Sequence, residues 1–229
     1  AFILGRMAWA KMDGLLIISG AFGMFDREIV IKAGGYNTKT VGEDMELVVR
    51  MRRYMIDHKQ NYAVQYIPDP LCWTEAPESY KILRKQRSRW TRGTFETLWI
   101  HRKMLLNPKY KILGMLSYPY WLVYEYCAPL IEFTGLLITL ILVFMGIISW
   151  VFFFLFLILV YAYAVMFSMM AIYAEESTFK RYTTFRDLWK LVFIALLEPI
   201  IFHPFTVYAA LVGNWEKIKR FELTPDVWS

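Results

Sequence analysis

The chain has little cysteine: only Cys72 and Cys127 occur in its 229 residues, one in a polar stretch and one beside an apolar stretch. This excludes a disulfide framework and a CxxC metal site, and it is compatible with a reducing compartment. The beginning of the chain also lacks the basic, apolar and small-residue succession of a secretory signal, as well as an initial methionine. We therefore expect the C-terminal portion of something longer. No internal repeat or low-complexity linker is evident.

Acidic residues are in the minority, because 26 Lys and Arg stand against 20 Asp and Glu, for a formal net charge of +6. Nucleic-acid binding is not favoured, since the basic residues lie beside aromatic and aliphatic runs and not along a polar face. Anionic lipid headgroups and an anionic substrate are the partners expected instead. Basic residues that directly precede an apolar region are typical of a cytoplasmic boundary. Here they are Arg84, Lys85, Arg87, Arg89, Arg92, Arg102 and Lys103.

Long apolar runs are abundant, and hydrophobic residues make up 57% of the chain. Residues 130–149 contain a single charge, Glu132, and residues 151–174 contain none. Each run is long enough to cross a bilayer, and the basic loop that follows them favours a hairpin with that loop in the cytoplasm. Residues 191–212 are a third candidate, which we expect to be broken by the two prolines within it.

The end of the chain bears on this topology. A third complete crossing would place residues 215–220, which contain Lys217, Lys219 and Arg220, outside the cell, which the positive-inside rule disfavours. Two alternatives remain: residues 191–212 form a broken, re-entrant or tightly folded hairpin, or residues 112–128 also interact with the membrane. We favour a cytoplasmic tail. Glu198 and His203 could form a polar membrane site or satisfy a broken helix, and we assign them no catalytic role.

Residues 1–106 carry most of the charge and predict a mixture of helices and strands. Apolar spacing predicts helices over 1–13, 27–33 and 43–57, with Gly34-Gly35 as a C-cap pair. Strand-like patterns cover 15–25 and 63–67. Residues 78–106 predict a long amphipathic helix rich in Arg and Trp, which is an interfacial composition.

Two short segments carry the candidate chemistry. Transfer of a sugar from a nucleotide diphosphate to a hydroxyl needs a base, a cation for the departing diphosphate and a surface that orients the acceptor. Asp44, in Gly42-Glu43-Asp44, is the candidate base, because a carboxylate at a helix start beside a glycine can be aimed into a cleft. The alternative is an ordinary solvent-facing or capping acid.

The second segment, residues 86–90, has the sequence Gln-Arg-Ser-Arg-Trp, and Gln86 shares a helical face with Arg89 or Trp90. A guanidinium makes paired hydrogen bonds to a diphosphate, and an indole suits the face of a sugar. The alternative is an interfacial helix, in which Arg binds lipid phosphate and Trp lies in the aromatic belt. A third segment, Ser19-Gly20-Ala21-Phe22-Gly23, offers backbone donors beneath an acceptor, or is a tight strand end.

Taken in order, four segments resemble the processive membrane glycosyltransferases of family 2, which include cellulose, hyaluronan, chitin and poly-N-acetylglucosamine synthases. They are residues 19–23, Ala33-Gly34-Gly35-Tyr36-Asn37, Gly42-Glu43-Asp44 and residues 86–90. The resemblance covers nearly the whole chain, since that family also follows its Gln-x-x-Arg-Trp helix with interfacial and transmembrane helices.

The resemblance implies roles for these residues. Asp44, with Glu43 beside it, would be the general base on the acceptor hydroxyl, and Trp90 would lie under the terminal acceptor sugar. The donor diphosphate and channel mouth would be lined by Gln86, Arg87 and Arg89. The acceptor-side loop would be Ser19, Gly20, Ala21, Phe22 and Gly23. Residues 215–220 are distantly similar to a segment that closes over the nucleotide, which would give Trp215, Lys219 and Arg220 a gating role.

The resemblance also implies a fold and a location. The expected fold class is α/β plus membrane α-helical. Residues 1–77 would be the C-terminal part of a GT-A (Rossmann-like) catalytic domain. They would be followed by interfacial helices (78–128), a transmembrane region (129–212) and the tail (213–229). The protein would be a multi-pass protein of the plasma (inner) membrane with its catalytic part on the cytoplasmic side.

The family's nucleotide-binding Asp and its Asp-x-Asp metal site are not found here and would belong upstream of Ala1. We therefore expect no metal site in this chain, Mg²⁺ or Mn²⁺ as the cofactor of the complete enzyme, and inactivity of these residues alone. The expected function is inverting transfer from a UDP-hexose or UDP-N-acetylhexosamine to a β-linked polysaccharide, with export through the membrane helices. The alternatives are a noncatalytic receptor or scaffold and a transferase that adds one sugar to a polyprenyl phosphate.

Overall fold

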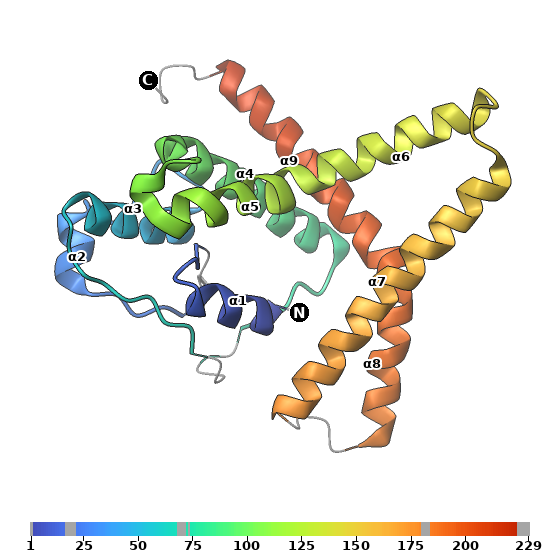
Figure 1. Cartoon of the computed structure of the whole chain (residues 1–229), viewed down its shortest axis with the longest axis horizontal. Helices are drawn as coiled ribbons and strands as arrows, with labels where there is room; N and C mark the ends of the chain where they lie inside the picture. Colours follow the sequence, from blue (N-terminus) through green and yellow to red (C-terminus); the bar gives the residue numbers. More distant parts are fainter. Residues whose placement is uncertain (1, 17–21, 68–71, 73, 180–183, 224–229) are drawn as a thin grey trace. The chain divides into compact units, whose positions relative to one another are not determined.

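The computed structural model describes residues 2–16, 22–67, 72, 74–179 and 184–223 (Figure 1). The chain divides into two compact units, each described by itself. Residues 3–129 with 209–229 are called the motif unit, and residues 1–2 with 130–208 the apolar unit.

The α-helices follow one another with short 3₁₀ and π-helical segments between them. They are α1 (Phe2–Lys11), α2 (Arg27–Lys32), α3 (Glu43–Asp57), α4 (Tyr80–Ile100), α5 (Tyr118–Tyr120), α6 (Ala128–Phe144), α7 (Trp150–Phe179), α8 (Phe185–Leu197) and α9 (His203–Leu223). The 3₁₀ segments are η1 (Arg102–Met104) and η2 (Pro108–Tyr110), and the π-helical ones are η3 (Leu113–Ser117), η4 (Trp121–Cys127) and η5 (Glu198–Phe202).

The α/β expectation is not confirmed, because none of the described residues lies in a β-strand. Residues 61–67 keep the alternation of exposed and partly buried side chains that predicted a strand. A strand, however, needs the N–H and C=O groups of a neighbour to complete its ladder, and the described residues offer none. The other expected strand, 15–25, falls partly on residues 17–21, which lie outside the described residues.

Helix α2 is capped at its start by Asp26 and ends where the glycine pair predicted. Asp26 Oδ1 accepts a hydrogen bond from the Ile29 amide at 3.1 Å, which satisfies an amide that the first helical turn leaves unpaired. Gly34 and Gly35 have φ angles of +97° and +71°, a conformation that residues with a Cβ rarely adopt. The predicted stop at these glycines is therefore confirmed.

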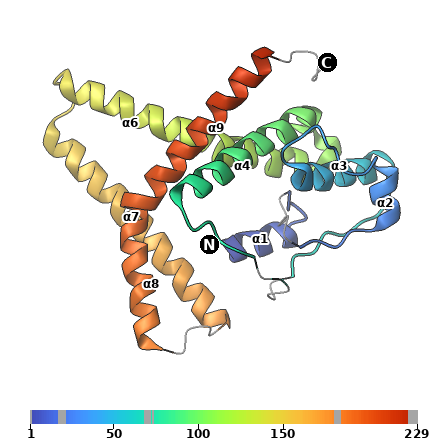
Figure 2. The same cartoon turned by 180° about the vertical axis from the view of Figure 1, so that it is seen from behind.

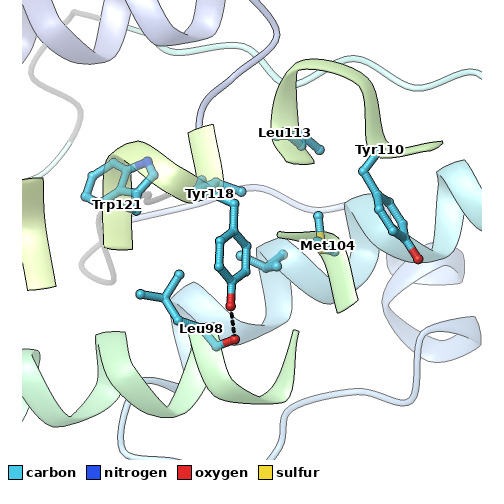
Figure 3. Close-up of a cluster of buried hydrophobic side chains, with 8 residues drawn as sticks. Leu98, Met104, Tyr110, Leu113, Tyr118 and Trp121 are labelled. Atoms are coloured by element: carbon cyan, nitrogen blue, oxygen red, sulfur yellow. Dashed lines mark hydrogen bonds between the residues drawn. The ribbon is translucent and has the colours of Figure 1, made fainter. Parts of the chain in front are cut away.

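Helix α3 covers the residues predicted from the sequence, and its apolar face packs toward α4. Val49 of α3 and Leu98 of α4 belong to one buried cluster with Leu16, Met104, Tyr110, Leu113, Tyr118 and Trp121. Figure 3 shows the Tyr118 hydroxyl directed at the Leu98 carbonyl oxygen, to which it donates a hydrogen bond. Because this bond pairs the buried hydroxyl, the phenol can fill the core without an unsatisfied polar group.

A charged network lies beneath α3. Glu46 and His101 are each 1% exposed, and 3.1 Å separates Glu46 Oε1 from His101 Nε2. The second oxygen of Glu46 accepts from Arg50 Nη2 at 2.7 Å, and Arg50 also donates to the carbonyl oxygens of Ala33 and Gly35. The network therefore joins α3 both to the segment after α4 and to the end of α2.

The apolar unit is built from α6, α7, α8 and the beginning of α9. Helices α7 and α8 lie side by side in both views of the chain (Figures 1 and 2), and the Tyr161 hydroxyl of α7 donates to the Leu196 carbonyl oxygen of α8 at 3.1 Å. Within the described residues, Trp150–Ser177 and Phe185–Glu216 are each long and apolar enough to cross a membrane. Leu113–Tyr126 and Ala128–Phe144 pass the same test together, with a bend of 47° between them, and would form a third span if the two are taken as one broken helix.

We expected the two prolines of residues 191–212 to break the helix, but they do not interrupt it. Pro199 lies in the π-helical turn η5, and Pro204 lies in the first turn of α9. A π-helical turn leaves room for a residue that has no amide hydrogen to donate. The helical course thus continues from Phe185 to Glu216.

Substitution of Glu46 by Ala should lower the free energy of unfolding by about 3 kcal/mol, because it leaves the partly buried Arg50 and the buried His101 without their carboxylate. The matched control is Glu28→Ala, which removes the exposed ion pair with Lys32 and should change it by less than about 1 kcal/mol. Thermal or denaturant unfolding in detergent measures both. Equal effects of the two substitutions would contradict the assigned role of the network.

Stability should also fall with acid because of His101. Burial lowers the pKa of this imidazole, although the hydrogen bond to Glu46 opposes the shift. Arg53 Nη1 lies 3.4 Å from His101 Nδ1 and can only donate, so the neutral ring carries its hydrogen on Nε2 and donates it to Glu46.

The unfolded imidazole takes up its proton near pH 6.5, before the folded one does. The contribution of His101 to stability is therefore complete above about pH 6.5 and is lost as the pH falls toward the lower folded pKa, by at most about 1.4 kcal/mol per pH unit. Unfolding curves between pH 7.5 and 5 should be steeper in pH for the native chain than for His101→Gln. Parallel pH profiles would show that His101 does not contribute.

Candidate active site

The two segments that carry the candidate chemistry meet at a pair of glycines. Gly42 precedes α3, and Gly93 lies in α4 one turn after the Gln86–Trp90 segment. A Cβ placed on Gly42 would lie 2.9 Å from Gly93 Cα, and one on Gly93 would lie 2.8 Å from Gly42 Cα. Such distances leave room for hydrogen only, so the backbones themselves are in contact. The start of α3, with Asp44, is thereby held against α4.

Two side-chain contacts reinforce this approach. Glu96 of α4 is buried, and its Oε2 accepts a hydrogen bond from the Val41 amide at 2.8 Å, just before α3 begins. Nearer the motif, Arg89 Nη2 lies 3.5 Å from Glu43 Oε1, with both side chains about half exposed. The structure thus gives Glu43 a cation as its partner. The prediction from sequence had placed it only beside the base.

Asp44 lies in the first turn of α3, partly buried, where the helix dipole favours a negative charge. Its Oδ1 accepts from the Met45 amide at 2.8 Å. Arg6 of α1 lies within electrostatic reach of Asp44, Tyr66 and Glu125, while burial lowers its pKa. Sequence reasoning assigned Arg6 no role. In the sequence, Arg6 was marked only as one of two cations, with Lys11, in an otherwise apolar helix.

Helix α4 presents its motif residues to two sides. Ser88 is 3% exposed, whereas Trp90 is 53% exposed and Arg89 is also exposed. The guanidinium carbon of Arg87 lies 4.7 Å from the centre of the Trp90 ring, which is a cation–π contact. Burial lowers the pKa of Arg87, but a guanidinium remains charged at physiological pH. The cation and the indole therefore form one surface.

The buried side of α4 is covered by α9. A Cβ on Gly213 would lie 2.8 Å from the Ser88 carbonyl oxygen, so α9 also approaches the motif through a glycine. Glu216 Oε2 accepts a hydrogen bond from Ser88 Oγ at 2.9 Å and lies 3.9 Å from Arg92 Nε. Sequence reasoning missed Gly213 and Glu216, since nothing in the sequence relates them to a segment more than a hundred residues earlier.

Of the other predicted site residues, some are described by the structure and some lie outside the described residues. Gln86 is partly buried on α4, and Trp215 is exposed on α9 beside Glu216. Phe22 is exposed in an irregular segment with Gly23. Ser19, Gly20 and Ala21 lie outside the described residues, as do the side chains of Lys219 and Arg220. In the described part of the chain, no three His, Cys, Asp or Glu side chains gather in a way that could hold a metal ion.

Comparisons with known proteins agree on one family. The model of "Glycosyl transferase family group 2" matches residues 4–167, which include most of α1, the whole of α2 to α6 and the first part of α7. The chain belongs to this family. The glycine contact between α3 and α4 lies inside the matched region, whereas the contact of α9 with Ser88 uses residues beyond it.

Relatives of this glycosyltransferase-family chain are similar over shorter stretches. The probable glycosyltransferase YdaM of Bacillus subtilis is 33% identical over 89 residues, which are 39% of this chain and 19% of that protein. The poly-beta-1,6-N-acetyl-D-glucosamine synthase of Staphylococcus aureus is 33% identical over 81 residues, or 35% of this chain and 18% of that protein. The match thus spans about a fifth of the length of these curated relatives. No solved structure matches.

Substitution of Gly93 by Ala should displace the start of α3 from α4, because the added methyl group would meet backbone atoms that cannot move aside singly. We expect weaker protection of the Val41 amide from hydrogen exchange and a lower unfolding temperature. Gly5→Ala is the matched control, since a Cβ there meets nothing within 4 Å. If both substitutions left exchange unchanged, the glycine contact would not hold the site together.

Proposed function

We propose that the protein takes part in inverting transfer of a sugar from a nucleotide diphosphate-sugar to the end of a growing β-linked polysaccharide. The observation that carries this proposal is the contact of Gly42 with Gly93. It brings a carboxylate, Asp44, to the helix that exposes a cation and an indole. Membership of glycosyl transferase family group 2 supports the same reaction class.

In the proposed mechanism, Asp44 accepts the proton of the acceptor hydroxyl as that oxygen attacks the anomeric carbon of the donor. The bond from the anomeric carbon to the diphosphate breaks on the opposite face, so the configuration inverts and the nucleoside diphosphate leaves. One base suffices, and no covalent enzyme intermediate is formed. Arg89 and Arg87 would offset the negative charge that develops on the departing diphosphate.

Trp90 would orient the acceptor. A pyranose ring presents C–H groups that pack on an aromatic face, and the exposed indole offers such a face. The Arg87 guanidinium, 4.7 Å from the centre of the ring, would help to hold the indole in this orientation. This arrangement would keep the terminal sugar in place while its hydroxyl faces the base.

The donor is proposed from a relative. Because the Staphylococcus aureus relative is a poly-N-acetyl-D-glucosamine synthase, UDP-N-acetylglucosamine is the first donor to test, with UDP-glucose second. Enzymes of this family generally use a divalent metal, but the described residues do not fit a metal site, and no step above passes through one. The two candidate spans support a membrane protein, and we propose that the motif unit faces the cytoplasm.

Asp44→Asn should lower polymer formation about 10²–10⁴-fold, because the amide cannot take the proton of the acceptor. The assay uses the protein as its gene encodes it, in membrane vesicles, with radiolabelled UDP-sugars. Glu28→Gln, on the exposed side of α2, is the control and should leave the rate unchanged. Normal synthesis by Asp44→Asn at normal expression would remove Asp44 from the mechanism.

A further inference from the structure

Arg6 is a cation that the proposed chemistry does not use, and it lies among ionisable side chains of other segments. It is partly buried in α1. Its electrostatic partners are Asp44 of α3, Glu125 of η4 and Tyr66 of the irregular segment 61–67. A guanidinium remains charged at physiological pH even where burial lowers its pKa, as it does here. The candidate base therefore has a permanent cation beside it, which in turn has a second carboxylate nearby.

The packing of α1 on η4 accounts for the proximity of Arg6 to Glu125. The ring centres of Trp9 and Tyr120 lie 4.9 Å apart. Arg6 precedes Trp9 by three positions and so shares its face of α1. Glu125 follows Tyr120 by five positions, about one π-helical turn, and so lies on the same side of that segment. The two faces in contact thus carry a cation and a carboxylate.

The end of α1 is also fixed to α3, the helix that begins beside the candidate base. Arg52 of α3 is 2% exposed, donates to the Asp13 carbonyl oxygen at 2.7 Å and forms an ion pair with the Asp13 carboxylate. Asp13 follows Arg6 by seven positions, and Arg52 follows Asp44 by eight, which is about two helical turns in each case. The electrostatic interaction of Arg6 with Asp44 agrees with this spacing. Helix α1 is therefore anchored both to the helix of the base and to η4.

We propose that Arg6 is a positioning residue for the base. Its guanidinium orients the Asp44 carboxylate toward the acceptor, and Glu125 is the counter-charge that stays when Asp44 has taken the proton. This inference rests on the proposed function, in which Asp44 receives that proton. The glycine contact holds the backbone of Asp44 against α4, whereas Arg6 acts on its side chain from α1.

The need for a counter-charge follows from the change of charge during the reaction. Before the transfer, Asp44 is negative and Arg6 interacts with two carboxylates. After the transfer, Asp44 is neutral, and a partly buried cation left without an anion would oppose the step. Glu125 removes this opposition, because Arg6 keeps one carboxylate throughout. The three side chains together then pass from a net negative charge to neutrality, with no cation left uncompensated.

The first test separates the chemical step from donor binding. Arg6→Gln should lower kcat for polymer formation about 10- to 100-fold, because the carboxylate loses the charge that orients it. The KM for the UDP-sugar should change less than about twofold, since Arg6 does not contact the donor in the proposed mechanism. Arg6→Lys keeps the charge and should recover most of kcat. The assay uses the protein as its gene encodes it, in membrane vesicles.

Lys11→Gln is the matched control, because Lys11 is the other cation of α1 and is exposed. It should change neither constant. The unfolding temperature in detergent is measured for each variant. A lower unfolding temperature of Arg6→Gln, with kcat and KM both altered and no recovery in Arg6→Lys, would show that Arg6 only docks α1 and would overturn the proposal.

The second test concerns the counter-charge. Glu125→Gln should lower kcat about tenfold, because protonation of Asp44 would then leave Arg6 without an anion. The double variant Arg6→Gln with Glu125→Gln should be no slower than Arg6→Gln alone, since no cation remains to be compensated. Losses that multiply in the double variant would show that the two side chains act independently, and would remove Glu125 from the proposal.

The inference and the proposed function fail in different ways. Normal kcat in Arg6→Gln, together with an inactive Asp44→Asn, would overturn the role of Arg6 and leave the proposed function intact. Normal synthesis by Asp44→Asn would overturn the assignment of the base, and the role of Arg6 with it.

Discussion

The contact between the backbones of Gly42 and Gly93 is the constraint on which the motif unit depends. Because neither residue has a side chain, the segment before α3 reaches the surface of α4 itself. Only at that separation can Glu96 accept from the Val41 amide and Arg89 approach Glu43. A side chain at either position would weaken both contacts together, since they depend on the same approach.

Helix α4 is consequently contacted on two sides, by the segment before α3 and by α9. These contacts determine which of its motif residues remain exposed. Gly93 meets the segment before α3, and Ser88, five positions earlier, meets Gly213 and Glu216 of α9. What remains at the surface between these contacts is Arg89 and Trp90. Beneath α3, the buried Glu46 and His101 add a rigid support whose removal leaves unpaired charge in the core.

Local signals in the sequence predicted much of this. The bounds of α3 and the stop of α2 followed from apolar spacing and from Gly34-Gly35, because each depends on residues a few positions apart. The two expected strands could not be predicted in this way. A strand forms only where a second segment pairs with it, and the alternation of side chains within one segment does not show whether such a partner exists. The order of the segments indicated the family. The hydrogen bonds of Glu216 with Ser88 and of His203 with Glu132, and the electrostatic interaction of Arg6 with Asp44, instead join positions far apart in the sequence.

The geometry also favours one of two adjacent carboxylates as the proposed base. Successive residues of a helix point about 100° apart, so Glu43 and Asp44 cannot serve the same place. Glu43 Oε1 lies 3.5 Å from Arg89 Nη2, so this carboxylate is directed at a cation of the motif helix. Asp44 uses one oxygen on the Met45 amide and keeps the other free of a hydrogen bond among the described residues. If Glu43 instead served to orient Arg89, its change to Gln would weaken donor binding more than the chemical step, whereas a change at Asp44 would do the reverse.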